Sequence, residues 1–385
     1  MSVLNVPAPA WKTDDLVLFE GEVFKFFERE LAPHSEKWRE QGVVDRWAWE
    51  KAGEAGLLCA SMPEAYGGAG GTFAHEQIIM EQQQRAGVDG FGISLHNGIV
   101  APYVQHYGTE EQKQRWLPRL ASGALVGAIA MTEPGTGSDL QAVMTSATKD
   151  GSDYIINGQK TFITNGQTAN LVIVVAKTDP KGGAAGTSLF VVETDEVEGF
   201  RRGRNLKKLG HKAQDTSELF FDDVRVPEEN RLGANDGMGF IQLMEQLPQE
   251  RHIIGVQGIA AIEHALELTI EYTKDRTAFG RPILKFQNTQ FVLADLKAKA
   301  TMARVFIDHC TDLLIKGELD PATGSMSKYL LSELENEVMD ECLQLFGGYG
   351  YMDEYPISRM YANARVQRIY GGTNEIMKLL IARTL

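Results

Sequence analysis

Two glycine clusters near the C-terminus have the residue type and spacing of a binding site. One comprises Gly347, Gly348 and Gly350, and the other comprises Gly371 and Gly372; both interrupt segments with helical patterns. Glycine inside a helix costs roughly 1 kcal/mol relative to alanine, so these clusters indicate turns at which the backbone approaches another group closely. We therefore expect the C-terminal part of the chain to bind a ligand.

A second candidate site lies in the middle of the chain. Residues 131–139 have the sequence Met-Thr-Glu-Pro-Gly-Thr-Gly-Ser-Asp, which combines two glycines with small hydroxyl side chains. Free amides and hydroxyl groups in an irregular loop suit a polar, planar ligand, although a tight surface turn has the same composition. Residues 160–166, Lys-Thr-Phe-Ile-Thr-Asn-Gly, place an aromatic ring among hydroxyl groups, but taken alone this pattern is more typical of an ordinary strand.

The composition limits the classes of function. The chain has 385 residues, 43% hydrophobic and 23% charged, and its formal net charge is −14. This length predicts two or three domains, and the negative charge argues against a nucleic-acid partner, because phosphate binding needs a basic surface. The chain has no apolar run of about 18 residues and no secretory signal pattern at its start. We therefore expect no membrane insertion, and a location in the bacterial cytoplasm or, for a mature eukaryotic chain, the mitochondrial matrix.

The cysteines and histidines do not form a metal-ligand pattern. Cys59, Cys310 and Cys342 lie far apart, with no Cys-x-x-Cys or Cys/His spacing, and the eight histidines are dispersed. We expect buried, reduced thiols and no metal site.

Hydrophobic periodicity predicts the elements that position the candidate residues. A helical first third is followed by a strand-rich middle part. The predicted helices cover residues 14–31, 47–58, 75–85, 92–106 and 110–121. The predicted strands cover residues 128–131, 154–156, 171–176, 189–192 and 219–226, with hairpin turns at Asp150-Gly151 and Asn157-Gly158.

The last part of the chain is again helical. Four long helices, at 239–273, 288–316, 325–346 and 356–383, predict an antiparallel bundle. No helix of crossover length separates the strands, so we expect the sheet to be antiparallel. The sequence thus predicts an α+β fold with a helical domain at 1–125, a central antiparallel β domain at 126–238 and a four-helix bundle at 239–385.

These segments, in this order and spacing, resemble the acyl-CoA dehydrogenase family of flavoproteins, and the resemblance covers nearly the whole chain. It rests on Pro63 to Gly68, the 131–139 loop, Lys207 to Gly210, Leu219 to Pro227, Asp275 to Gly280 and the two C-terminal glycine segments. The resemblance implies the three-domain fold predicted above, FAD as the cofactor and a homotetramer. A Rossmann dinucleotide-binding enzyme is disfavoured, because Gly347 to Gly350 follow a long helix and no strand.

The resemblance also implies the ligand contacts, carried over by motif. One FAD would bind between two subunits, with Arg276 and Gln287 of one subunit and Gln344, Gly347 and Gly348 of its neighbour holding the ADP half. The complete predicted FAD set is Met131, Thr132, Ser138, Phe162, Ile163, Thr164, Arg276, Phe279, Gln287, Gln344, Gly347, Gly348, Thr373 and Glu375. The predicted substrate set is Ser138, Ile241, Arg251, Gly371 and Gly372, with Ile241 lining the acyl tunnel.

The catalytic base is predicted from an absent carboxylate. Many relatives carry a glutamate directly before Gly-Thr in the C-terminal loop, where this chain has Gly371. The long-chain and isovaleryl types supply the base from the first bundle helix, where this chain has Glu250 between apolar residues. Loss of hydration raises the pKa of such a carboxylate toward the range of a general base. The amide of Gly371 would then bind the thioester carbonyl as an oxyanion-hole donor.

The resemblance implies a long-chain-type acyl-CoA dehydrogenase. Glu250 would remove the α proton while hydride leaves Cβ for flavin N5, giving trans-2-enoyl-CoA and passing electrons to an electron-transferring flavoprotein. A branched-chain acyl-CoA dehydrogenase is the main alternative; an acyl-CoA oxidase, a flavin monooxygenase relative and a non-catalytic acyl-CoA-binding or assembly protein are others. Gly98 either opens the acyl tunnel or permits close helix packing.

Overall fold

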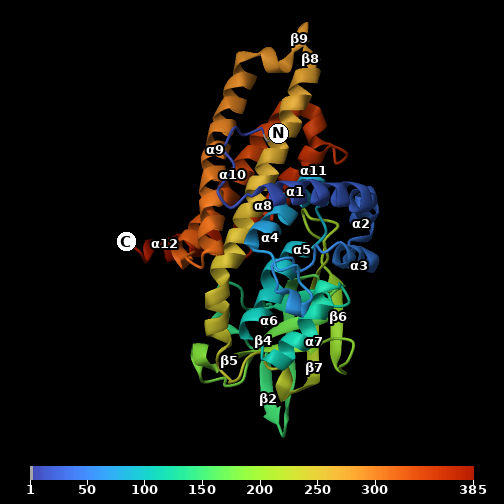
Figure 1. The fold of residues 1–385 in the computed structure, drawn as a ribbon, viewed down its shortest axis with the longest axis vertical. Coiled ribbons are helices and arrows are strands. Elements are labelled where there is room, and N and C mark those ends of the chain that lie inside the picture. Colours follow the sequence, from blue (N-terminus) through green and yellow to red (C-terminus); the bar gives the residue numbers. More distant parts are fainter. Residues whose placement is uncertain (1–2) are drawn as a thin grey trace.

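Helices begin and end the chain and a β-sheet lies between them in the computed structural model, which describes residues 3–385 (Figure 1). Every predicted N-terminal helix is present, and α2 is an additional one. The N-terminal α-helices are α1 (Asp14–Phe26), α2 (Ser35–Gln41), α3 (Arg46–Glu54), α4 (Phe73–Arg85), α5 (Ile93–Leu95), α6 (Ala101–Tyr107) and α7 (Glu110–Ala121). Thr109 and Gln112 form a capping box that begins α7. A π-helical turn, His96–Val100, joins α5 to α6.

Seven strands form one sheet within the described residues. They are β1 (Gly127–Ala130), β2 (Ser146–Asp150), β3 (Asp153–Thr164), β4 (Leu171–Lys177), β5 (Thr187–Glu193), β6 (Phe200–Asn205) and β7 (Thr216–Pro227). The order is β1-β4-β2-β3-β7-β6, and β5 pairs with β4. Both β4 and β5 are buried along their whole length, because one face packs against residues of α6 and α7 and the other packs against residues of β3 and β7.

Two predictions about the sheet need correction. The sheet is mixed, because β1 pairs with β4 in parallel, with Gly127 opposite Leu171. The β2–β3 hairpin carries the chain back between them, so a helix is not needed for the crossover. The turn predicted at Asp150-Gly151 is confirmed, but Asn157-Gly158 lies inside β3 at a register shift. Glycine fits there because a Cβ would lie 2.4 Å from Thr145 Oγ1.

The C-terminal part is a helical bundle whose predicted fourth helix is broken. Its helices are α8 (Gly239–Asp275), α9 (Gln287–Ile315), α10 (Pro321–Phe346), α11 (Pro356–Ala364) and α12 (Asn374–Ala382), and a short hairpin, β8 (Thr277–Ala278) with β9 (Arg281–Pro282), follows α8. The helix predicted over 356–383 is interrupted because Gly371 and Gly372 have φ values of +64° and +93°. These angles are incompatible with a right-handed helix.

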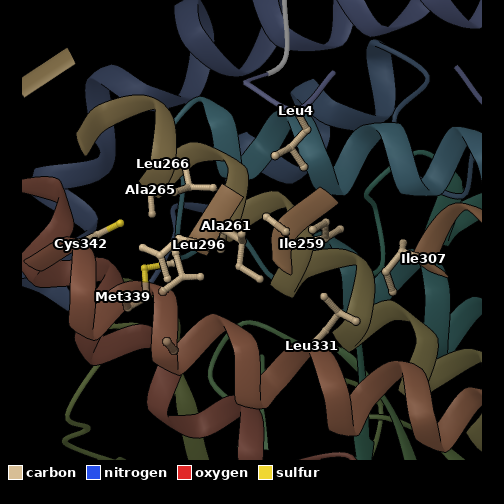
Figure 2. Close-up of a cluster of buried hydrophobic side chains, with 14 of the residues drawn as sticks. Leu4, Ile259, Ala261, Ala265, Leu266, Leu296, Ile307, Leu331, Met339 and Cys342 are labelled. Carbon is tan, nitrogen blue, oxygen red and sulfur yellow. The ribbon is translucent and has the colours of Figure 1, made fainter. Parts of the chain in front are cut away.

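The bundle core lies between α8, α9 and α10. Side chains such as Ile259, Leu296 and Leu331 converge there, and Leu4 packs onto the same cluster (Figure 2). Each such buried aliphatic side chain contributes roughly 1.5–3 kcal/mol to folding. The three cysteines are buried and free, as predicted. Helix α8 is long and apolar enough to cross a membrane, but 67% of its most apolar window is buried in the protein, as in a core helix of a soluble bundle.

Candidate active site

A cavity of about 640 Å³ lies where the three parts of the chain meet. The N-terminal helices contribute Leu95, the sheet and its loops contribute Met131 and Phe162, α8 contributes Glu250, and the C-terminal loop contributes Gly371. The 131–139 loop, the 160–166 segment, Glu250 and the Gly371–Gly372 cluster therefore converge, although about 240 residues separate the first of them from the last, whereas the cluster at Gly347, Gly348 and Gly350 does not line this cavity.

Glu250 is a buried carboxylate within this cavity. It is only 6% exposed, and Tyr103 of α6 donates a hydrogen bond from its hydroxyl to Oε1 at 2.8 Å. Burial raises the pKa of Glu250 to about 7, while the Tyr103 hydrogen bond and the charge of Arg251 lower it. A carboxylate with a pKa near neutrality can exchange a proton at physiological pH, as a general base must.

Arg251 is a buried cation without a carboxylate partner among the described residues. It is 6% exposed, its Nη1 lies 3.4 Å from Ser325 Oγ, and its Nε has no hydrogen-bond partner. Burial lowers the pKa of Arg251, and the nearby Glu250 raises it. Unsatisfied buried donors are costly, so a guanidinium in this state on a cavity wall is suited to contact an oxygen of a ligand.

The 131–139 loop is held from behind by its own acidic residue. Glu133 forms an ion pair with the fully buried Lys160 at 2.8 Å and accepts hydrogen bonds from the backbone N–H groups of Met144 and Thr145. Asp139 accepts a hydrogen bond from the N–H of Gln141. Both acids therefore shape the loop, and Asp139 lines the cavity together with Met131, Thr132 and Ser138.

Phe162 is held in a strained conformation beside that loop. Its φ is +59°, which is unusual for a bulky residue, and its side chain is 66% exposed although it lines the cavity. The pairing of β3 with β7 shifts register between Lys160 and Ile163, so Phe162 lies at a bulge that re-aims its ring. Ile163 and Thr164 also line the cavity. Strain of this kind is concentrated at ligand sites.

Gly371 and Gly372 form another part of the cavity wall, directly before α12. A Cβ on Gly371 would lie 2.3 Å from Ile254 Cδ1, so the loop packs directly on α8. Thr373 caps α12 by accepting a hydrogen bond from the N–H of Ile376, and the buried Lys328 of α10 donates to Asn374 Oδ1 at 2.7 Å. Neither Thr373 nor Glu375 lines the cavity; both flank its glycine wall.

Ile241 does not belong to the cavity, contrary to the prediction. It is 48% exposed and absent from the lining, to which Phe240, Met244 and Leu247 contribute instead. Nine residues at 3.6 per turn rotate a side chain by about 180° relative to Glu250, so Ile241 lies on the other side of α8.

The ADP-binding residues predicted for FAD lie at the far end of the bundle. Arg276 follows α8, and the 26 residues between it and Glu250 span about 39 Å of helix. The Arg276 guanidinium lies 5.6 Å from the ring centre of Tyr349 in the same chain, so the segments predicted to come from two different subunits meet at one end of one chain. This end, with the β8–β9 hairpin, is at the top of Figure 1, far from the sheet. The predicted ADP-binding residues are Arg276, Gln287, Gln344, Gly347 and Gly348, and Phe279 of the wider predicted FAD set lies in the turn between β8 and β9.

One further feature, Tyr103, escaped the sequence patterns, and the structure decides between the two alternatives for Gly98. Tyr103 gave no signal, because a tyrosine on the buried face of a helix has the same pattern whether or not it meets a carboxylate. Gly98 permits close packing: a Cβ there would lie 2.4 Å from Ile253 Cδ1, and its carbonyl accepts a hydrogen bond from Gln249 Nε2. Leu95 and Ile99 of the same segment line the cavity.

Three family models match the chain in succession. They are the acyl-CoA dehydrogenase N-terminal domain at residues 13–124, the middle domain at 128–224 and the C-terminal domain at 237–385. Together they cover all the segments that contribute to the cavity.

Relatives and solved structures agree with these models. The long-chain specific acyl-CoA dehydrogenase, mitochondrial, of Sus scrofa is 50% identical over 96% of this chain and 86% of its own length. An acyl-CoA dehydrogenase of Bacillus subtilis is 37% identical over 97% and 98%. The crystal structure of acyl-CoA dehydrogenase from Geobacillus kaustophilus matches with a TM-score of 0.96 and 46% identity over 98% and 99%. A glutaryl-CoA dehydrogenase from Mycobacterium smegmatis in complex with FADH2 matches with a TM-score of 0.90 and 30% identity over 97% and 94%.

Proposed function

The chain belongs to the acyl-CoA dehydrogenase family of FAD-dependent oxidoreductases, and we propose that it oxidises long-chain acyl-CoA thioesters to trans-2-enoyl-CoA. The observation that carries this proposal is the buried Glu250 in the cavity wall, facing a C-terminal loop that has glycine where a carboxylate would otherwise stand. The 50% identity with a long-chain specific relative supports the chain-length class.

The cavity residues fit the isoalloxazine part of FAD. The exposed ring of the strained Phe162 offers a flat apolar surface, and the loop bearing Thr132 and Ser138 offers hydroxyl and amide groups for polar ring atoms. Gly137 has open space at its Cβ position, so the loop backbone there is accessible. When bound, FAD supplies the acceptor for the hydride that leaves Cβ of the substrate.

Glu250 and Gly371 would perform the proton chemistry. The carboxylate of Glu250 takes the α proton of the thioester and becomes neutral, which its pKa of about 7 permits near neutral pH. The negative charge that develops on the thioester oxygen would be stabilised by the backbone N–H of Gly371. Arg251, with its unsatisfied Nε, would orient the substrate from the same helix.

We further propose that the far end of the bundle completes the cofactor site of a neighbouring subunit. One dinucleotide cannot contact both Glu250's cavity and Arg276 of the same chain across about 39 Å of helix. Arg276 with Gln287, Gln344 and the glycines after α10 would therefore hold the ADP half of a neighbour's FAD, in a homotetramer. Electrons would pass to an electron-transferring flavoprotein.

An anaerobic bleaching scan of the flavin tests the function. The FAD-loaded protein is mixed with straight acyl-CoAs of increasing length and with branched acyl-CoAs, and the loss of flavin absorbance is followed. We expect rapid bleaching with long straight chains. Preference for branched chains would replace the proposal with a branched-chain dehydrogenase, and rapid reoxidation of the bleached enzyme in air would indicate an oxidase. Absence of bleaching with every acyl-CoA would overturn the proposal.

A further inference from the structure

Glu250 is anchored through only one of its two carboxylate oxygens. Tyr103 donates a hydrogen bond to Oε1 at 2.8 Å, whereas Oε2 has no hydrogen-bond partner among residues 3–385. Tyr103 is completely buried and Glu250 is nearly so, and the two residues come from α6 and α8, 147 positions apart. A tertiary contact therefore fixes one oxygen and leaves the other available in the cavity wall.

Resting on the function proposed above, we propose that Tyr103 is a positioning residue for proton transfer at Glu250. The Tyr103 hydroxyl holds Oε1 on the α6 side, so that Oε2 is the oxygen that accepts the α proton. In this step the Cα–H bond breaks, a new O–H bond forms at Oε2, and the electron pair remains on the thioester enolate. The O–H bond of Tyr103 stays intact throughout, so the tyrosine orients the base without exchanging a proton.

The same hydrogen bond favours the ionised form of the base. An ionised carboxylate accepts a stronger hydrogen bond than a neutral carboxyl group, so a buried donor lowers the pKa. Burial raises the pKa of Glu250, and the value of about 7 is the balance of burial against the lowering effects of Tyr103 and Arg251. Burial and the nearby Glu250 raise the pKa of Tyr103 itself well above its usual range, so it remains a donor.

Other titratable groups near Glu250 already have different partners. On α6, Tyr107 donates to Glu245 Oε2 at 2.9 Å, and His106 Nδ1 lies 2.6 Å from Gln246 Nε2. On α10, Lys328 donates to Asn374. On α8, Arg251 acts on Glu250 only through its charge, because no ion pair joins them. Tyr103 is therefore the only described side chain that hydrogen-bonds to the base.

The test compares Tyr103→Phe with Tyr107→Phe. Both substitutions remove one hydroxyl from α6, and the two rings lie only 6.0 Å apart, but Tyr107 donates its hydrogen bonds to Gln242 and Glu245 and makes none to Glu250. For Tyr103→Phe we expect the acidic limb of the kcat/KM profile to move up by about one pH unit, so that activity below the limb falls about tenfold and recovers at pH 9. For Tyr107→Phe we expect the limb to stay in place. An unmoved limb in FAD-loaded Tyr103→Phe, with or without a uniform loss of activity, overturns the proposal.

A second variant keeps the proposal testable if Tyr103→Phe folds poorly. Replacing Tyr103 by 3-fluorotyrosine keeps the hydroxyl and nearly the same volume but makes the phenol a stronger donor. We expect this variant to shift the acidic limb in the opposite direction, to lower pH; a limb that stays or rises overturns the proposal.

A non-turnover measurement separates this inference from the proposed function. A 3-thia-acyl-CoA can lose its α proton but has no Cβ hydride to transfer, so the long-wavelength absorbance of its enolate beside oxidised flavin reports Glu250 ionisation alone. We expect the pH midpoint of this signal to rise in Tyr103→Phe. If wild-type enzyme forms the signal and bleaches with acyl-CoA but the midpoint does not move, only the role of Tyr103 fails. If wild-type enzyme does neither, the proposed function fails.

Discussion

The two ends of helix α8 present opposite situations. At one end Glu250 and Arg251 are each 6% exposed and enclosed by the other parts of the same chain. At the other end Phe279, in the turn of the β8–β9 hairpin that extends beyond the bundle (Figure 1), is 96% exposed, and Tyr351 is 84% exposed. Under the proposed function, the residues of the proton chemistry lie within one chain, whereas the exposed aromatic groups of the far end would be covered by a neighbouring subunit and its cofactor. One helix would thus carry the base at one site and serve a different subunit at the other.

Loss of the base should give the largest effect at the cavity end. We expect Glu250→Gln to slow anaerobic flavin bleaching by about 10³-fold, within the range of 10²–10⁴ for a general base, while FAD stays bound. The matched control is Glu245→Gln, because Glu245 lies on the same helix but bonds to Tyr107 outside the cavity. Near wild-type bleaching by Glu250→Gln would show that the cavity end does not hold the base.

Loss of a cation should affect the far end differently. We expect Arg276→Ala to weaken FAD retention about 10- to 100-fold, since a charge-assisted hydrogen bond to a phosphate contributes roughly 1.5–3 kcal/mol. Dialysis against increasing FAD concentrations measures this, with Lys274→Ala as control because Lys274 pairs with Glu271 on the helix surface. Normal FAD affinity combined with slow bleaching would contradict the division of tasks between the two ends.

Moving the carboxylate across the cavity should restore part of the activity. A glutamate in place of Gly371 would meet Ile254 Cδ1 at 2.3 Å, so the combination Glu250→Gly with Gly371→Glu is expected to be obstructed. Adding Ile254→Val removes that methyl group, and we expect the triple variant to bleach about tenfold faster than the double variant. The measurement is the anaerobic bleaching rate of the folded, FAD-loaded double and triple variants. Equal rates would mean that position 371 and position 250 do not reach the same substrate.

The last expected effect is on stability and not on activity, and it depends on pH. The pKa of Glu250 is raised to about 7 in the folded protein, so the unfolded chain loses its proton first and Glu250 destabilises the fold as pH rises from about 4.5 to 7. We expect Glu250→Gln to have the same melting temperature as wild type at pH 4.5 and a higher one at pH 8. At pH 8 its free energy of unfolding should exceed that of wild type by an amount on the order of 2–3 kcal/mol. A constant difference across this range would show that the carboxylate titrates normally.

Local sequence patterns predicted most helices and strands correctly. They failed where contacts between distant parts of the chain determine the structure, as in the pairing of strands. The N-terminal helices and the turn at Gly151 follow from periodicity and turn chemistry. The parallel β1–β4 pair could not be predicted, because partner choice in a sheet depends on how the whole chain packs. The helical repeat alone indicates that Ile241 lies on the side of α8 away from Glu250, but the prediction that placed Ile241 in the acyl tunnel did not apply it.

The sequence by itself determined the family, the succession of elements and the choice of Glu250 over Gly371 as the predicted base, because these depend on residue identity and local spacing. Only the tertiary structure decided how that carboxylate is held. The hydrogen bond from Tyr103 joins residues 147 positions apart, and the burial that raises the pKa of Glu250 arises from several elements packing around it. Spacing along a chain cannot specify such a contact, since it depends on the direction of each side chain and on the water that packing excludes.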